Sequence, residues 1–189
     1  MKVTDNKLVA KDKELLATLI GSELEFLISD KISSVRPMSF GIVGICVGGR
    51  TFALRADIGP GEPFGEPDDV VQLSFREEER NSIRPICIGT QQAEYRIGRN
   101  IKGIVVYEDT IERLAYNKVV SRYISTAAIA FLLEGTELVF ENQGWLDEVI
   151  DIHRGPGASH KVRPPEAPIE DDDPEDFRVL REAISLGKK

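Results

Sequence analysis

The sequence predicts an α+β fold: a mainly antiparallel sheet built from two β-hairpins plus central strands, covered by an N-terminal helix, with a second helix tethered at the C-terminus. Three features lead to this prediction. Two apolar segments alternate around glycine turns, residues 12–29 carry apolar side chains at three- and four-residue steps, and residues 155–173 are rich in proline, glycine and aspartate. We therefore expect one α+β domain (1–154), a flexible linker (155–173) and a C-terminal helix (174–189).

Both helices are expected from their start signals and their apolar spacing. Asp12 can cap a helix that runs to about Ser29. Its apolar face would consist of Leu16, Leu19, Ile20, Leu24, Leu27 and Ile28. Asp173 as N-cap and Pro174 as first helical residue predict the second helix, which Gly187 would end. Its apolar face would consist of Phe177, Leu180 and Ile184.

The first hairpin is expected over residues 42–55, because Gly48 and Gly49 supply the positive φ of a two-residue turn. Side chains alternate between the two faces of a strand, so the register follows from the turn. The predicted partners on the apolar face are Val47 with Arg50, Ile45 with Phe52, and Val43 with Leu54. The opposite face pairs Gly44 with Ala53, and it is so flat that we expect another element to lie against it.

The second hairpin is expected over residues 129–140, around Glu134 and Gly135. Its predicted partners are Leu133 with Thr136, Phe131 with Leu138, and Ile129 with Phe140. Neither hairpin buries enough apolar surface to be stable alone, so both are expected to share a larger sheet.

The remaining segments are assigned by pattern. Residues 70–76 alternate as a half-buried strand, and residues 84–89 and 100–108 are apolar runs of strand length. Residues 109–124 are compatible with a helix or with the continuation of a strand, and residues 145–154 are expected to form a short helix.

Composition and charge exclude several classes of function. The net charge of −8 argues against a nucleic-acid-binding protein. No apolar run reaches the roughly 18 residues of a membrane span, and the N-terminus is not a signal peptide, so we expect a cytoplasmic protein without a membrane partner. Cys46 and Cys87 are expected to be buried free thiols, because cytosolic disulfides are rare.

Acidic residues are concentrated between residues 60 and 80, where seven acids face two arginines and give a net charge of −5. The loop at 60–69 is stiffened by three prolines. Its candidate interaction residues are Glu62, Phe64, Glu66, Asp68 and Asp69. Phe64 could anchor an interface or fold back onto the sheet, and in the second case the acids would only solvate the loop.

A weaker candidate is a metal site in the helix expected at residues 145–154. Asp147 and Asp151 are four residues apart and His153 follows, so a divalent metal could be bound. The alternative is a solvated helix face with His153 near the C-terminal dipole. Because no further ligands are recognisable, we predict no cofactor.

Two classes of function follow. The first is a small acidic intracellular interaction protein, non-catalytic, such as a regulator or inhibitor of a partner with a basic surface; the C-terminal helix could also mediate self-association. The second is a small-ligand-binding protein or an enzyme with a pocket at the face around Gly44 and Ala53. The chain contains no G-x-S-x-G and no phosphate-binding glycine motif, so enzymatic activity is left open.

Overall fold

The computed structural model of the chain describes residues 1–30, 38–63, 67–84, 91–144, 147–165 and 177–187. Of these described residues 71% are in strands, mostly antiparallel, and 11% are helical. Its elements are β1 (Lys2–Asn6), α1 (Ala10–Thr18), β2 (Glu23–Asp30), β3 (Met38–Phe40), β4 (Ile42–Val47), β5 (Arg50–Gly61), β6 (Asp68–Glu77), β7 (Gln92–Ala115), β8 (Lys118–Leu133), β9 (Thr136–Gly144), β10 (Asp147–Gly155) and β11 (Phe177–Leu186). Short 3-10 helices lie at Arg80–Ser82 and Ala158–Lys161.

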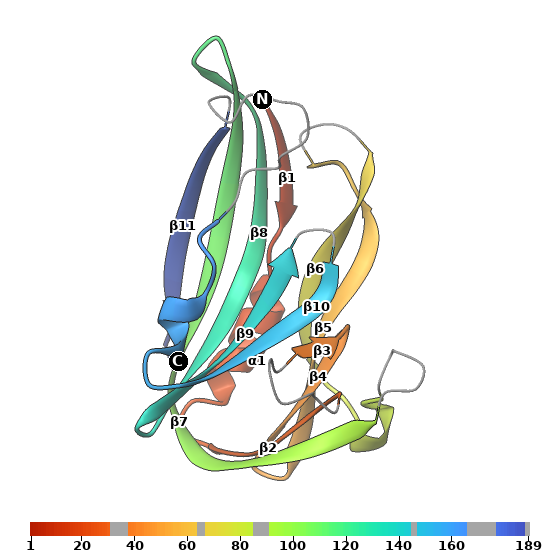
Figure 1. The fold of residues 1–189 in the computed structure, drawn as a ribbon, viewed down its shortest axis with the longest axis vertical. Coiled ribbons are helices and arrows are strands. Elements are labelled where there is room, and N and C mark those ends of the chain that lie inside the picture. Colours follow the sequence, from red (N-terminus) through yellow and green to blue (C-terminus); the bar gives the residue numbers. More distant parts are fainter. Residues whose placement is uncertain (31–37, 64–66, 85–90, 145–146, 166–176, 188–189) are drawn as a thin grey trace.

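The strands form one connected sheet in the order β3-β10-β9-β8-β7-β2-β4-β5-β6. The long strand β7 joins its two halves, because its first part pairs with β2 and its second part pairs with β8. β1 pairs with β8 in parallel, and β11 pairs with β7 over ten residues. Figure 1 shows the sheet bending so that β7 and β8 lie on one side of the molecule and β5 and β6 on the other.

The main apolar core lies in the concave space between these two halves. It combines Leu16 of α1 with Phe52 and Phe75 of β5 and β6, and with Phe131 and Phe140 of β8 and β9. All five side chains are at most 1% exposed. The core therefore holds the two halves of the sheet together from strands that are distant in sequence.

Both hairpins have the predicted register. β4 and β5 pair Val43 with Leu54 and Ile45 with Phe52, and β8 and β9 pair as the pattern around Gly135 requires. Gly48, Gly49 and Gly135 all have positive φ, as these turns demand. The flat face around Gly44 is covered as expected: a Cβ on Gly44 would lie 3.0 Å from side-chain atoms of Ile28 and Ile83.

Other strand assignments are settled as well. β6 buries Val71, Leu73 and Phe75 as predicted. Residues 109–124 belong to strands β7 and β8, which meet at a turn where Tyr116 and Asn117 have positive φ. Residues 85–90, with Cys87, lie outside the described residues, and Cys46 is a buried free thiol.

The α+β prediction is wrong, because α1 is the single α-helix of the described residues and spans only Ala10–Thr18. Asp12 is not its N-cap; the Asp12 carboxylate instead accepts a hydrogen bond from the Phe75 backbone N–H at 2.9 Å. The helix ends at Thr18, and Gly21, with a φ of +90°, lies in the turn that leads into β2. Residues 23–30 then form β2, which lies between β4 and β7 and is apolar on both faces, so its spacing resembled that of a helix.

The predicted helices at 145–154 and 174–189 are also wrong. Residues 147–155 form β10, between β9 and β3. Residues 177–186 form β11, so a self-association through a C-terminal helix has no basis in this fold. Pairing with β7 outweighed the weak helical pattern of this segment. Residues 166–173 of the expected linker lie outside the described residues, and the domain division itself stays a prediction.

No helix among the described residues has the length and apolar character needed to cross a membrane.

Candidate functional site

The candidate site lies where β9 and β10 pair side by side. Asp151 and Glu141 are direct cross-strand partners, so their side chains project from the same face of the sheet. His153 follows Asp151 by two residues and shares that face. The neighbouring residues Phe140 and Ile152 project from the opposite face into the core. The alternation of two strands therefore brings an imidazole and two carboxylates together.

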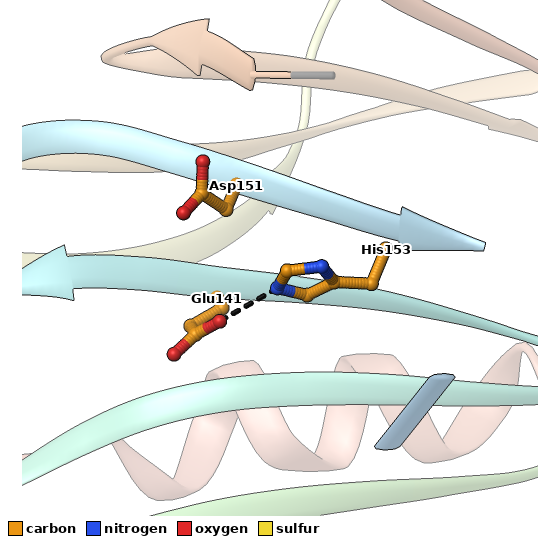
Figure 2. Close-up of side chains that lie close together, drawn as sticks. All are labelled: Glu141, Asp151 and His153. Atoms are coloured by element: carbon orange, nitrogen blue, oxygen red, sulfur yellow. Dashed lines mark hydrogen bonds and ion pairs between the residues drawn. The ribbon is translucent and has the colours of Figure 1, made fainter. Parts of the chain in front are cut away.

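These three side chains form a compact cluster. One ligand atom from each lies within 4.8 Å of the other two. His153 Nε2 is 2.6 Å from Glu141 Oε2 (Figure 2). Glu141 is 3% exposed and Asp151 is fully buried, whereas His153 is partly exposed. The cluster thus combines two carboxylates shielded from water with an imidazole that still contacts solvent.

Residues 156–165, which we call the covering segment, run across this face of the sheet. Ala158 is fully buried against Ala128, Ala130 and Val139. The carboxylates of β9 hold the segment through its backbone: Ser159 N–H donates to Glu137 at 2.8 Å, and Arg163 N–H donates to Glu141 at 2.8 Å. The covering segment is therefore the reason why charged residues on the outer face are buried.

Two further polar side chains complete the cluster. The Arg163 guanidinium donates to Glu141 Oε1 at 3.1 Å and lies 3.8 Å from Asp151 Oδ2. The Gln143 amide donates to both oxygens of Asp151, at 2.9 and 3.0 Å. The carboxylates are thus oriented by donors from β9 and from the covering segment.

The pKa of the Glu141 carboxyl lies below its ordinary value. Burial acts to raise it, but hydrogen bonds from His153 and from the backbone and side chain of Arg163 outweigh that effect. Glu137 also has a lowered pKa, chiefly because of the Ser159 backbone N–H. Both carboxylates are therefore anionic in the folded protein near neutral pH.

The lowered pKa predicts how Glu141 contributes to stability. A carboxyl whose pKa is lower when folded stabilises the protein above its unfolded pKa of about 4.3, and this contribution is lost as pH falls through the folded pKa. The free energy of unfolding of the wild type should therefore exceed that of Glu141→Gln near neutral pH, and the difference should narrow as pH falls below about 4.3. A difference that keeps growing below about pH 4.3 would contradict this assignment.

The structure selects among the residues proposed for a metal site. Asp151 and His153 come together, although on a strand rather than on the expected helix. Asp147 is not part of the group: it is exposed and its carboxylate accepts a hydrogen bond from the Val149 backbone N–H at 3.0 Å. Glu141 was not predicted as a ligand.

The acidic residues between 60 and 80 fall into two groups. Glu62 pairs with Lys2, Glu77 with Arg50, and Glu78 with Arg55. Asp68 and Asp69 are exposed at the start of β6. Phe64 and Glu66 lie outside the described residues. Part of the acidic excess is therefore neutralised within the chain.

The expected ligand pocket at Gly44 and Ala53 is filled by the side chain of Ile83. A hollow of about 560 Å³ lies nearby, lined by Glu25, Cys46, Gly49, Arg50, Thr51, Glu77, Glu78, Glu79, Arg80 and Asn81. Its arginines are already engaged, Arg50 with Glu77 and Arg80 with Glu94. The hollow therefore offers a ligand no uncommitted arginine.

Comparison of the chain with family models, curated proteins and solved structures yields no match.

Proposed function

We propose that this chain is a non-catalytic interaction protein, a regulator or inhibitor, that docks onto a basic protein surface through the loop end of its β5–β6 hairpin. The observation that carries the proposal is the group Asp57, Asp68 and Asp69. All three are exposed, and within the described part of the chain none of them makes an ion pair. We call this group the acidic tip.

The arrangement of the hairpin supports this proposal. Asp68 pairs in register with Gly61, and Asp69 pairs with Pro60. Asp57 lies opposite Gln72, farther from the loop that connects the two strands. The three carboxylates are thus held on a paired, ordered backbone. Because the strands fix their positions, little entropy is lost when a partner binds.

An apolar contact lies beside the acids. Ile58 is 46% exposed although its register partner Val71 is buried, and the alternation of the strands places it on the same face of the hairpin as Asp69. An interface commonly combines an apolar contact with a charged rim. The acidic tip would thus steer a basic partner, and Ile58 would contribute a short-range contact.

Charge reversal tests this proposal. The full chain is used to capture partners from the native host, and association with the captured protein is measured for the wild type and for the triple variant Asp57→Lys, Asp68→Lys and Asp69→Lys. We expect the association rate to fall by at least about tenfold and the dissociation rate to change less, because the lost interaction is long-range. The wild-type rate should also fall as salt rises, since screening shortens to about 8 Å at physiological ionic strength.

A matched control has the same change in net charge elsewhere on the surface. Glu134, Asp147 and Glu182 are likewise exposed, and replacing all three by lysine should leave the association rate near that of the wild type. If both triple variants slow association equally, overall charge rather than the acidic tip is responsible. If neither does, the proposal is wrong. The anchoring role of Phe64 stays a sequence-based prediction.

A further inference from the structure

The chain contains a second candidate for binding, independent of the acidic tip. We propose that Glu141, Asp151 and His153 bind one divalent transition-metal ion, of the Zn²⁺, Mn²⁺ or Co²⁺ class, between β9 and β10. The three ligand atoms already lie within 4.8 Å of one another. Ligands at about 2.1 Å from a metal lie roughly 3 to 3.5 Å from each other, so small side-chain rotations suffice.

The donor set determines the class of metal. One imidazole nitrogen and two carboxylate oxygens suit zinc and the neighbouring transition metals better than calcium or magnesium, which prefer oxygen ligands alone. Three protein ligands leave coordination positions for water. The partly exposed His153 lies on the side from which solvent and ion can enter.

The surroundings of the carboxylates resemble the outer contacts of a metal site. Metal-ligating carboxylates are usually oriented by hydrogen bonds from neighbouring groups. The Gln143 amide holds Asp151, and the Arg163 backbone N–H holds Glu141.

Arg163 acts as the resident cation that a metal would replace. Its guanidinium lies between the two carboxylates, 3.1 Å from Glu141 Oε1 and 3.8 Å from Asp151 Oδ2. Its side chain is 39% exposed, so it can turn into solvent while its backbone N–H stays bound to Glu141. Metal binding should therefore compete with the Arg163 side chain but not with the docking of the covering segment.

The experiment measures binding of Zn²⁺, Mn²⁺ and Co²⁺ to the full chain by equilibrium dialysis, with the visible absorption of Co²⁺ reporting its ligand set. We expect one ion per chain. His153→Ala should weaken binding by at least about 100-fold, and Gln143→Ala by about tenfold, as for an outer contact. Arg163→Ala should bind at least about tenfold more tightly, because it removes the competing charge. Affinity should fall as pH is lowered, since the ligands bind in their deprotonated forms.

The chain supplies matched controls. His160 is the only other histidine and is exposed on the covering segment. His160→Ala and Asp147→Asn should leave the affinity unchanged. If His153→Ala does not fold, the Arg163→Ala and Gln143→Ala variants still carry the test. Absence of binding to both the wild type and Arg163→Ala, or binding that His160→Ala abolishes, would overturn the proposal and leave the cluster as an ion-pair network.

Discussion

Replacing Phe131 by alanine should lower the free energy of unfolding by about 3–5 kcal/mol. Phe131 is completely buried, and its ring meets that of Phe140 edge to face with centroids 5.7 Å apart. It belongs to the core that joins the two halves of the bent sheet. The substitution therefore removes contacts between distant strands and leaves a cavity in the core.

Urea unfolding of the variant provides the measurement, and Leu180→Ala provides the control. Leu180 is also apolar but 51% exposed on β11, so its truncation should cost about 1 kcal/mol or less. The urea midpoint of Phe131→Ala should fall, whereas the dependence of the unfolding free energy on urea concentration should stay constant. If the two variants are equally stable, Phe131 does not occupy the central core position described above.

The parts of the fold that could be predicted from the sequence are those fixed by local chemistry. Gly48 with Gly49, and Gly135, require turns with positive φ, and the alternation on either side then determines each register. Such signals involve neighbouring residues only. For this reason the sequence alone predicts the register of both hairpins pair by pair.

The wrong helix predictions concern strands that are buried on both faces, because such strands lack a simple alternation of apolar and polar residues. β2 lies inside the sheet and is interrupted by an irregularity between Leu24 and Phe26, so its apolar spacing imitated a helix. In β10 the outer-face residues Asp151 and His153 are polar although the covering segment lies over them. The sequence of this strand therefore resembles that of a helix with one solvent-exposed face. No pattern within residues 147–155 reveals that the covering segment lies over them.

The candidate site illustrates the same limit. The sequence predicts Asp151 and His153 as metal ligands because of their side-chain chemistry. Their separation by two residues places them on one face only if the segment is a strand. Glu141 was detectable in principle, because Glu137, Glu141 and Gln143 alternate with the core residues Leu138 and Phe140. Its pairing with Asp151, however, depends on the register of β10, which shifts between Asp147 and Ile150 and so does not follow from simple alternation.

Replacing Arg181 by methionine should lower the free energy of unfolding by about 3 kcal/mol, because it leaves a buried carboxylate without its cation. Arg181 on β11 donates to both oxygens of Asp109 on β7, at 2.6 and 2.7 Å. Their side chains are 20% and 9% exposed. Arg181 also donates to the Arg163 carbonyl, so the pair fastens the C-terminal strand to the covering segment as well as to β7.

Arg178→Met on the same strand is the matched control. Arg178 pairs with Glu112, which is 1% exposed, but Glu112 also pairs with Arg122 of β8. Both arginines lower the pKa of Glu112, Arg122 most strongly. Because Arg122 remains, Arg178→Met should cost only about 1 kcal/mol, as for a partly exposed ion pair.

The two variants are compared by urea unfolding at neutral pH, where Arg181→Met should lower the midpoint further than Arg178→Met. If instead both substitutions lower the free energy of unfolding equally at neutral pH, Arg122 does not compensate for the loss of Arg178 at Glu112. If neither destabilises the protein, β11 contributes to stability through its backbone pairing with β7 and not through its ion pairs.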